Sequence, residues 1–182
     1  MKQHPCLTPF MLLLFVLALA MPAGAQRFAL TNVNIQTCFT PGEDCTDQIV
    51  EEIGHTKSEI LVPAYSFTSL AIAQALVDAS GRGVKVQAIL DKSQRSERYT
   101  SAQYLANARI PIYIDDRHGI AHNKIIVIDR SVTITGSFNF TKAAQERNAE
   151  NLLVIRSSEI ARTYLENWHV HKGHSEVYQA RY

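Results

Sequence analysis

Short apolar segments alternate along this chain with segments that have the spacing of amphipathic helices, and this alternation constrains the fold more than any other feature. Aliphatic and β-branched residues dominate the apolar segments, which predicts buried strands. The predicted strands cover residues 28–37, 59–67, 84–90, 110–114, 124–128, 132–135 and 151–155. The predicted helices cover 47–53, 68–81, 102–108 and 159–170, with a short one near Thr141. The chain is therefore expected to form an α/β sandwich that contains a β-hairpin.

Two kinds of local signal support these boundaries. Thr68 is the expected N-cap of the second helix, and Gly81 is its expected end. Asp44 and Thr46 are the capping candidates before the first helix. A tight turn at residues 129–131 joins the two strands of the hairpin.

The first 25 residues predict a secretory signal peptide. Lys2 precedes an apolar run at 10–21, and small residues at 23–25 form a cleavage site. A retained membrane anchor is the alternative, although this run is short for a transmembrane helix. Removal of residues 1–25 leaves 26–182 as one domain that is periplasmic or secreted.

The expected export determines how the cysteines are interpreted. Cys6 leaves with the signal peptide, whereas Cys38 and Cys45 flank the turn-forming sequence "FTPGED". Two cysteines cannot supply a complete tetrahedral zinc site, and an oxidising compartment favours their pairing. We predict a local disulfide.

Charge is unevenly distributed along the chain. The formal net charge is only +1, which by itself does not indicate a polyanionic partner. Residues 81–147, however, hold eleven Lys or Arg against six Asp or Glu, while residues 26–60 are acidic. A positive half can attract a polyanion even on a nearly neutral protein, although a solvated mixed surface explains this pattern equally well.

Three apolar strands each have a pair of polar residues, two positions apart, at one end. Side chains two apart in a strand point to the same face, so each pair is directed together. Buried polar groups need partners, and a core has no use for three such pairs. We expect these ends to meet and to line one pocket. The pairs are His122 and Lys124, Ser137 and Asn139, and Asn148 and Glu150, with Gly136 directly before the second pair.

These residues resemble the signature of the phospholipase D superfamily. "HNKIIVID" matches H-x-K-x4-D, "GSFN" follows six residues later, and N-x-E appears in "NAENLLVI". The resemblance extends over nearly all of residues 26–182 and is greatest to small bacterial endonucleases with a single motif. It implies an α/β fold in which helices flank both faces of a mixed β-sheet.

The chemistry of these side chains suits cleavage of a phosphodiester. His122 can attack phosphorus and form a phosphohistidine, while Lys124 and Asn139 hold the phosphate oxygens, with Ser137 as a further donor. Glu150 can accept a hydrogen bond from a histidine ring and fix its tautomer. The family signature places Asp129 in the catalytic set as well, but strand alternation points it to the opposite face, which favours a structural role. Gly136 and Asn148 are expected to support the site, Gly136 by letting the backbone approach a ligand closely.

One histidine cannot be nucleophile and general acid in the same step, because attack needs a neutral ring and donation needs a charged one. The chain has a single motif, so the resemblance implies a homodimer in which two motifs form one composite site. Neither a cofactor nor a metal is expected. The expected substrate is DNA, with RNA as a second possibility.

Two other functions share these residues. A phospholipase D would use the same chemistry on lipid headgroups, but the sequence has no basic amphipathic helix for docking on a bilayer, and no stable membrane association is expected. The other alternative function is that of a catalytically inactive module that binds nucleic acid.

The remaining histidines are interpreted as non-catalytic. The spacing of His118 and His122 would suit a zinc site on a helix, but Gly119 and the following strand argue against a helix there. His169, His171 and His174 are expected to lie in a solvated tail after the last helix, where adventitious metal binding is the alternative.

Overall fold

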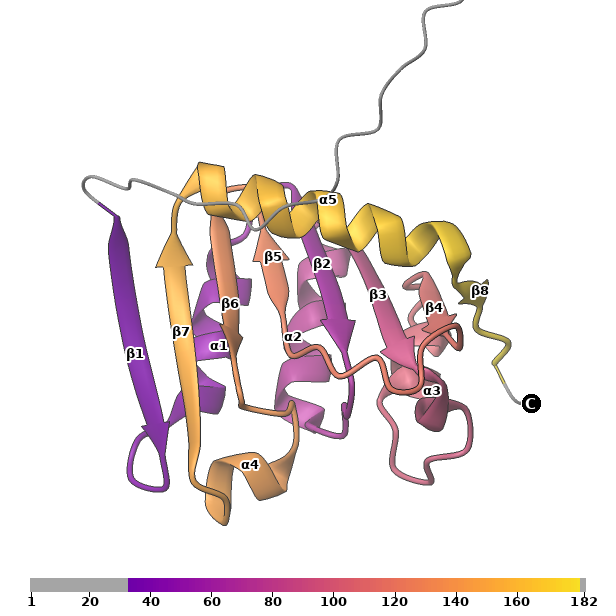
Figure 1. Cartoon of the computed structure of the whole chain (residues 1–182), viewed down its shortest axis with the longest axis horizontal. Helices are drawn as coiled ribbons and strands as arrows, with labels where there is room; N and C mark the ends of the chain where they lie inside the picture. The colour runs from indigo at the N-terminus through magenta and orange to yellow at the C-terminus, as the bar shows by residue number, and fades with distance from the viewer. Residues whose placement is uncertain (1–32, 181–182) are drawn as a thin grey trace, which may run out of the picture.

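The computed structural model describes residues 33–180, and the predicted signal peptide lies outside this range. The described chain forms one eight-stranded sheet in the order β1-β7-β6-β5-β2-β3-β4-β8 (Figure 1). Among the described helices, none combines the length and apolar character that a membrane crossing requires.

The elements follow one another largely as the alternation predicts. The strands are β1 (Asn34–Thr40), β2 (Glu59–Ala64), β3 (Lys85–Asp91), β4 (Ile112–Asp115), β5 (Ile126–Ile128), β6 (Val132–Gly136), β7 (Glu150–Arg156) and β8 (Glu176–Val177). The α-helices are α1 (Cys45–His55), α2 (Leu70–Gly81), α3 (Ala102–Asn107), α4 (Lys142–Glu146) and α5 (Ser158–His174). A 3-10 turn, η1 (Lys92–Arg95), follows β3.

The sheet is mixed. Strands β2, β3 and β4 are parallel, whereas β1, β7, β6 and β5 pair antiparallel with one another, and β5 also pairs antiparallel with β2. The predicted hairpin is β5 and β6, in which Ile126 faces Ile134. Asp129 and Arg130 form its turn with φ of 48° and 55°, the left-handed conformation that tight two-residue hairpin turns require.

Helices cover both faces of the sheet, as the predicted α/β fold requires. On one face α1, α2 and α3 pack on an apolar core that includes Ile49, Leu76 and Leu105. On the other face α5 crosses the strands from β7 towards β4 (Figure 1), and Trp168 packs there against Leu61 and neighbouring residues. The sheet is therefore buried on both sides, which explains why its central strands are almost entirely apolar.

Several element boundaries differ from the prediction. Ser69, and not Thr68, caps α2, because the Ser69 hydroxyl accepts from the backbone N–H of Ile72. The last helix continues to His174, so the prediction of a solvated tail is wrong for the histidines that it contains. The two-residue strand β8 was not predicted, because a segment this short carries no periodic signal.

The predicted disulfide is present. Cys38 in β1 and Cys45 at the start of α1 form a disulfide, with their Cα atoms 5.7 Å apart, and both residues are buried. Asp44 lies in the closed loop and caps α1 by accepting from the backbone N–H of Asp47. The bridge therefore fixes the start of α1 against the edge strand of the sheet.

Candidate active site

Four strand ends meet at one edge of the sheet, the lower edge in Figure 1. Because β5 runs antiparallel to both β2 and β6, the start of β5 lies beside the ends of those two strands. The start of β7 lies beside the end of β6 for the same reason. A pocket of about 430 Å³ opens there. Its lining consists of His122, Lys124, Gly136, Ser137, Asn139 and Glu150.

Five of the six residues in the three predicted polar pairs thus line one cavity, and the sixth, Asn148, contacts it through Glu150. The Asn148 side chain donates to Glu150 Oε1 at 2.9 Å. The Ser137 hydroxyl donates to Glu150 Oε2 at 2.5 Å. Both carboxylate oxygens of Glu150 are therefore held by neighbours from its own chain.

Lys124 is the buried cation of the pocket. Its side chain donates to the backbone carbonyl of His122 at 3.0 Å, and the residue is only 7% exposed. Burial lowers the pKa of the Lys124 ammonium, while the negative charge of Glu150 partly opposes this effect. A poorly hydrated ammonium aimed into a polar cavity is a strong binding group for an anion.

Tyr65, at the end of β2, contacts both reactive groups of the H-x-K motif. The centroid of its ring lies 4.7 Å from that of His122, and the Lys124 ammonium lies 5.2 Å from the same ring. The backbone N–H of Tyr65 donates to the backbone carbonyl of Asn123 at 2.7 Å. Sequence reasoning did not select Tyr65, because an aromatic residue at the end of an apolar strand is usually part of the core.

The Asn139 side chain carries a polar atom without a partner. Its Oδ1 is buried and accepts no hydrogen bond from the described residues. The side chain also lines the pocket, and an asparagine amide carries an NH2 group that can donate to an anion.

The structure requires glycine at position 136 for a reason that differs from the predicted one. It adopts φ of 148°, and a Cβ at this position would lie 2.2 Å from the backbone oxygen of Asn151 in β7. The glycine thus permits close approach of two strands, which brings Ser137 and Glu150 together.

Asp129 lies outside the pocket, at the opposite end of β5. Its carboxylate accepts from the backbone N–H groups of Lys57, Ser58 and Glu59 and from the Ser58 hydroxyl, at 2.7 to 2.9 Å. Burial alone would raise the pKa of Asp129, but these hydrogen bonds hold it below its ordinary value. The geometry favours the structural alternative for this residue.

Among the described residues no hydrogen bond joins Glu150 to His122, so the expected carboxylate–histidine pair does not form within one chain. His122 itself is exposed at the mouth of the pocket. A single chain therefore brings together the predicted nucleophile and the predicted phosphate-binding groups, and among the described residues no hydrogen bond to Glu150 orients the imidazole ring.

His118, His171 and His174 lie elsewhere. The residues around His118 form a bend and not a helix, so His118 does not share a helical face with His122. Instead it meets His171 and His174, whose side chains are 16% and 15% exposed on α5. Sequence reasoning missed this grouping, although the three-residue spacing of His171 and His174 places them on one helix face.

A mixed α/β sheet with a histidine, a buried lysine, an asparagine and a glutamate at one edge defines a class of phosphodiesterases. The model of the family described as "Cardiolipin synthase, PLD-like domain" matches residues 49–170. The chain belongs to the phospholipase D superfamily, and it is a phosphodiesterase of that superfamily.

Individual relatives cover most of the chain. A "Phospholipase D" of Rickettsia typhi is 42% identical over 149 residues, which span 82% of this chain and 73% of that protein. The crystal structure of Nuc from Salmonella typhimurium, a phospholipase D family member, matches with a TM-score of 0.78 and 35% identity. That match covers 81% of this chain and 99% of Nuc. Mouse "Mitochondrial cardiolipin hydrolase" is 28% identical over 132 residues, which span 72% of this chain and 60% of that protein.

Proposed function

We propose that this protein is an exported, non-specific endonuclease that cleaves DNA, with RNA as a second candidate substrate, through a phosphohistidine without a metal ion. The observation that carries this proposal is the pocket itself, which is lined by His122, the buried Lys124 and Asn139. Nucleophile and anion-binding groups thus come together at the scale of one phosphate.

The first step forms a bond between phosphorus and a ring nitrogen of His122. The bond from phosphorus to the leaving oxygen breaks, and a protonated second histidine gives its proton to that oxygen. In the second step, water attacks phosphorus, the phosphorus–nitrogen bond breaks, and the second histidine takes the proton from water. Lys124 and Asn139 stabilise the negative charge on the non-bridging oxygens in both steps.

The second histidine is His122 of another copy of the chain. No other histidine lines the pocket among the described residues, since His118 points to a separate cluster. A symmetric homodimer brings two copies of the pocket together across a two-fold axis. In this arrangement Glu150, already held by Ser137 and Asn148, can accept from one of the two histidine rings.

The charge at the active-site edge favours nucleic acid as the substrate. The segments that follow β3 and β4, and the one between β6 and β7, begin at the same edge as the pocket (Figure 1). They carry Arg98, Arg117 and Arg147, all exposed, and no salt bridge within the described residues neutralises them. The Arg98 guanidinium lies 5.4 Å from the ring centre of Tyr99, which is 70% exposed and could stack on a base.

Hydrolysis of phospholipid headgroups is the second candidate, because the Rickettsia relative is named phospholipase D and the mouse relative cardiolipin hydrolase. Two exposed apolar side chains would support it: Phe39, at the end of β1, and Ile120, in the loop before His122. They are single residues rather than a contiguous patch, and scattered exposed apolar residues are usual on soluble proteins.

One assay separates the candidates. Residues 26–182 are incubated with plasmid DNA, with RNA, and with vesicles of phosphatidylcholine or cardiolipin, all with chelator present. His122→Ala and Lys124→Ala serve as inactive controls. We expect nicking of plasmid that both substitutions abolish. Turnover of lipid without cleavage of nucleic acid would replace the first candidate by the second, and no turnover of any substrate would favour a binding module.

A further inference from the structure

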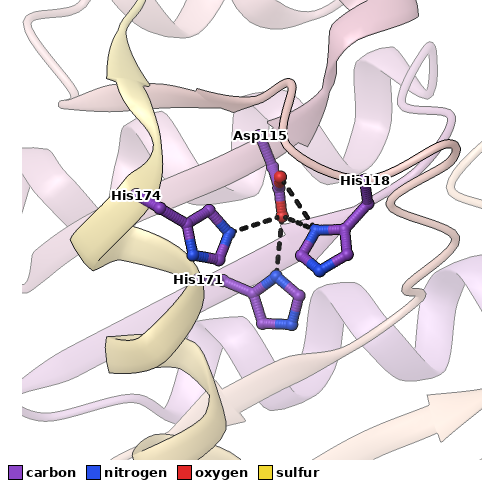
Figure 2. A group of neighbouring side chains, drawn as sticks. All are labelled: Asp115, His118, His171 and His174. Carbon is purple, nitrogen blue, oxygen red and sulfur yellow. Dashed lines mark hydrogen bonds and ion pairs between the residues drawn. The ribbon is translucent and has the colours of Figure 1, made fainter.

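Asp115, His118, His171 and His174 form a cluster away from the catalytic pocket (Figure 2). Asp115 ends β4 and its side chain is fully buried, and His118 lies in the loop that follows. His171 and His174 belong to the last turn of α5. Two segments that are distant in sequence therefore direct one carboxylate and three imidazoles to one point.

The rings converge on a single oxygen. Asp115 Oδ2 lies 2.7 Å from His171 Nδ1, 3.0 Å from His118 Nδ1 and 3.3 Å from His174 Nε2 (Figure 2). The centroids of the three rings are only 5.0 to 5.4 Å apart. A ring nitrogen that donates to this oxygen carries a proton, but imidazole has a second tautomer in which the same nitrogen holds a lone pair. The nitrogens that face Asp115 can therefore bind a metal ion when the ring proton lies on the other nitrogen.

The four donor atoms already have the spacing of a coordination site. One atom from each residue can be chosen so that all lie within 4.8 Å of one another. Tetrahedral zinc with bonds of about 2.0 to 2.2 Å separates its ligand atoms by roughly 3.4 Å. Asp115 Oδ2 now lies 2.7 to 3.3 Å from the ring nitrogens, so on metal binding this oxygen moves back slightly while the nitrogens stay within reach of one ion. Three imidazoles and one carboxylate suit a borderline ion such as Zn²⁺, whereas Mg²⁺ prefers oxygen ligands.

The surroundings satisfy two further requirements of a metal site. The other carboxylate oxygen, Asp115 Oδ1, accepts from the backbone N–H of Arg117 at 3.2 Å, which orients the carboxylate. The side chain of His118 is 45% exposed, whereas those of His171 and His174 are nearly buried. An ion can therefore enter past His118 and become enclosed.

We propose that these four residues bind one Zn²⁺ ion, or a similar divalent transition metal, with a structural role. The ion fastens the end of α5 and the loop 116–123 to the end of β4. That loop leads directly to His122, and none of the four ligands lines the catalytic pocket. The site is thus independent of the metal-free chemistry proposed for the pocket, and it stands even if the substrate assignment fails.

The test uses residues 26–182 without a histidine tag, stripped of metal with a chelator that is then removed. Zn²⁺ is titrated by calorimetry, Co²⁺ serves as a spectroscopic probe of tetrahedral geometry, and thermal unfolding is followed with and without Zn²⁺. The variants are His171→Gln and His174→Gln. His169→Ala is the matched control, because His169 lies on the same helix, is exposed and is outside the cluster.

We expect one equivalent of Zn²⁺ per chain, a tetrahedral Co²⁺ spectrum and a higher Tm with Zn²⁺, in wild type and His169→Ala alike. Each glutamine variant should lose affinity at least about tenfold. Weak, non-stoichiometric binding to wild type would overturn the proposal, and so would equal binding by the glutamine variants. Loss of binding in His169→Ala would also overturn it. If a variant does not fold, the wild-type stoichiometry and Co²⁺ spectrum alone decide.

Discussion

Substitution of Asp129 by Asn separates a structural from a catalytic role for the last residue of H-x-K-x4-D. The carboxylate accepts four hydrogen bonds from residues 57–59, and asparagine would turn an NH2 group towards some of those donors. Each such bond contributes about 0.5–1.5 kcal/mol, but water can replace part of the loss because Lys57 and Ser58 are exposed. We expect a loss of about 2 kcal/mol in the free energy of unfolding, which lowers Tm by roughly 4–8 °C.

The pH dependence gives this prediction a second readout. The folded-state pKa of Asp129 is lower than the unfolded one, so its carboxylate stabilises the fold above the unfolded pKa. That contribution is lost as pH falls through the folded pKa. The difference in unfolding free energy between wild type and Asp129→Asn should be full at pH 7 and should shrink below about pH 4.

The assay combines denaturant unfolding at several pH values with initial rates of plasmid cleavage per folded molecule. Asparagine is a fair probe because it tolerates the left-handed φ of 48° at this position. We expect kcat to stay within about threefold of wild type, since general acid–base and nucleophilic groups contribute far more than that. The reasoning is refuted if kcat falls as far as in His122→Ala while Tm and its pH dependence stay unchanged.

Four further predictions concern the chemistry and the fold. Cleavage should survive EDTA, because Lys124 and Asn139 fill the charge-neutralising role, and restoration of lost activity by Mg²⁺ would contradict this. The affinity for nucleic acid should fall steeply with salt: a plot of the logarithm of the binding constant against log[salt] should have a slope of about −0.9 for each phosphate neutralised. Binding should show little base preference. Replacing Cys38 and Cys45 by serine should lower the free energy of unfolding by about 2.5 kcal/mol in denaturant titrations, as expected for so short a loop. A heterodimer with one His122→Ala subunit should be almost inactive, and activity proportional to the fraction of wild-type chains would instead indicate one site per monomer.

The pocket lined by the polar pairs could be predicted because its signals are local. Two residues two apart in a strand share a face, so each pair could be recognised without knowledge of the fold. The meeting of the three pairs required the antiparallel order of β5, β6 and β7, which the predicted hairpin made reasonable. What the sequence did not indicate is that Ser137 and Asn148 occupy both oxygens of Glu150, because hydrogen-bond partners depend on rotamers and not on spacing.

The histidine cluster could not be predicted, because it depends on where α5 ends and what lies beneath it. The predicted end of the last helix at residue 170 left these histidines in a solvated tail, yet the helix continues through Gly173 to His174. Packing of Trp168 against the sheet holds this part of α5 in place, and such tertiary contacts override a weak local preference. A pattern of Asp-x-x-His followed by His-x-x-His would have been the signal to search for.

The backbone is held on both sides of His122, and this arrangement explains how a loop can fix the position of the proposed nucleophile. Asp91, which is 2% exposed, accepts from the backbone N–H of Ala121 at 2.8 Å. The backbone carbonyl of Asn123 accepts from the backbone N–H of Tyr65, and the backbone of Lys124 pairs with that of Ala64 in β2 in an isolated antiparallel β-bridge. Groups that must meet a reacting atom act best when rigid elements fix their positions. His122 is exposed, yet the residues on either side of it are tied to the ends of β2 and β3, so in the proposed reaction the ring can meet phosphorus without first ordering the loop.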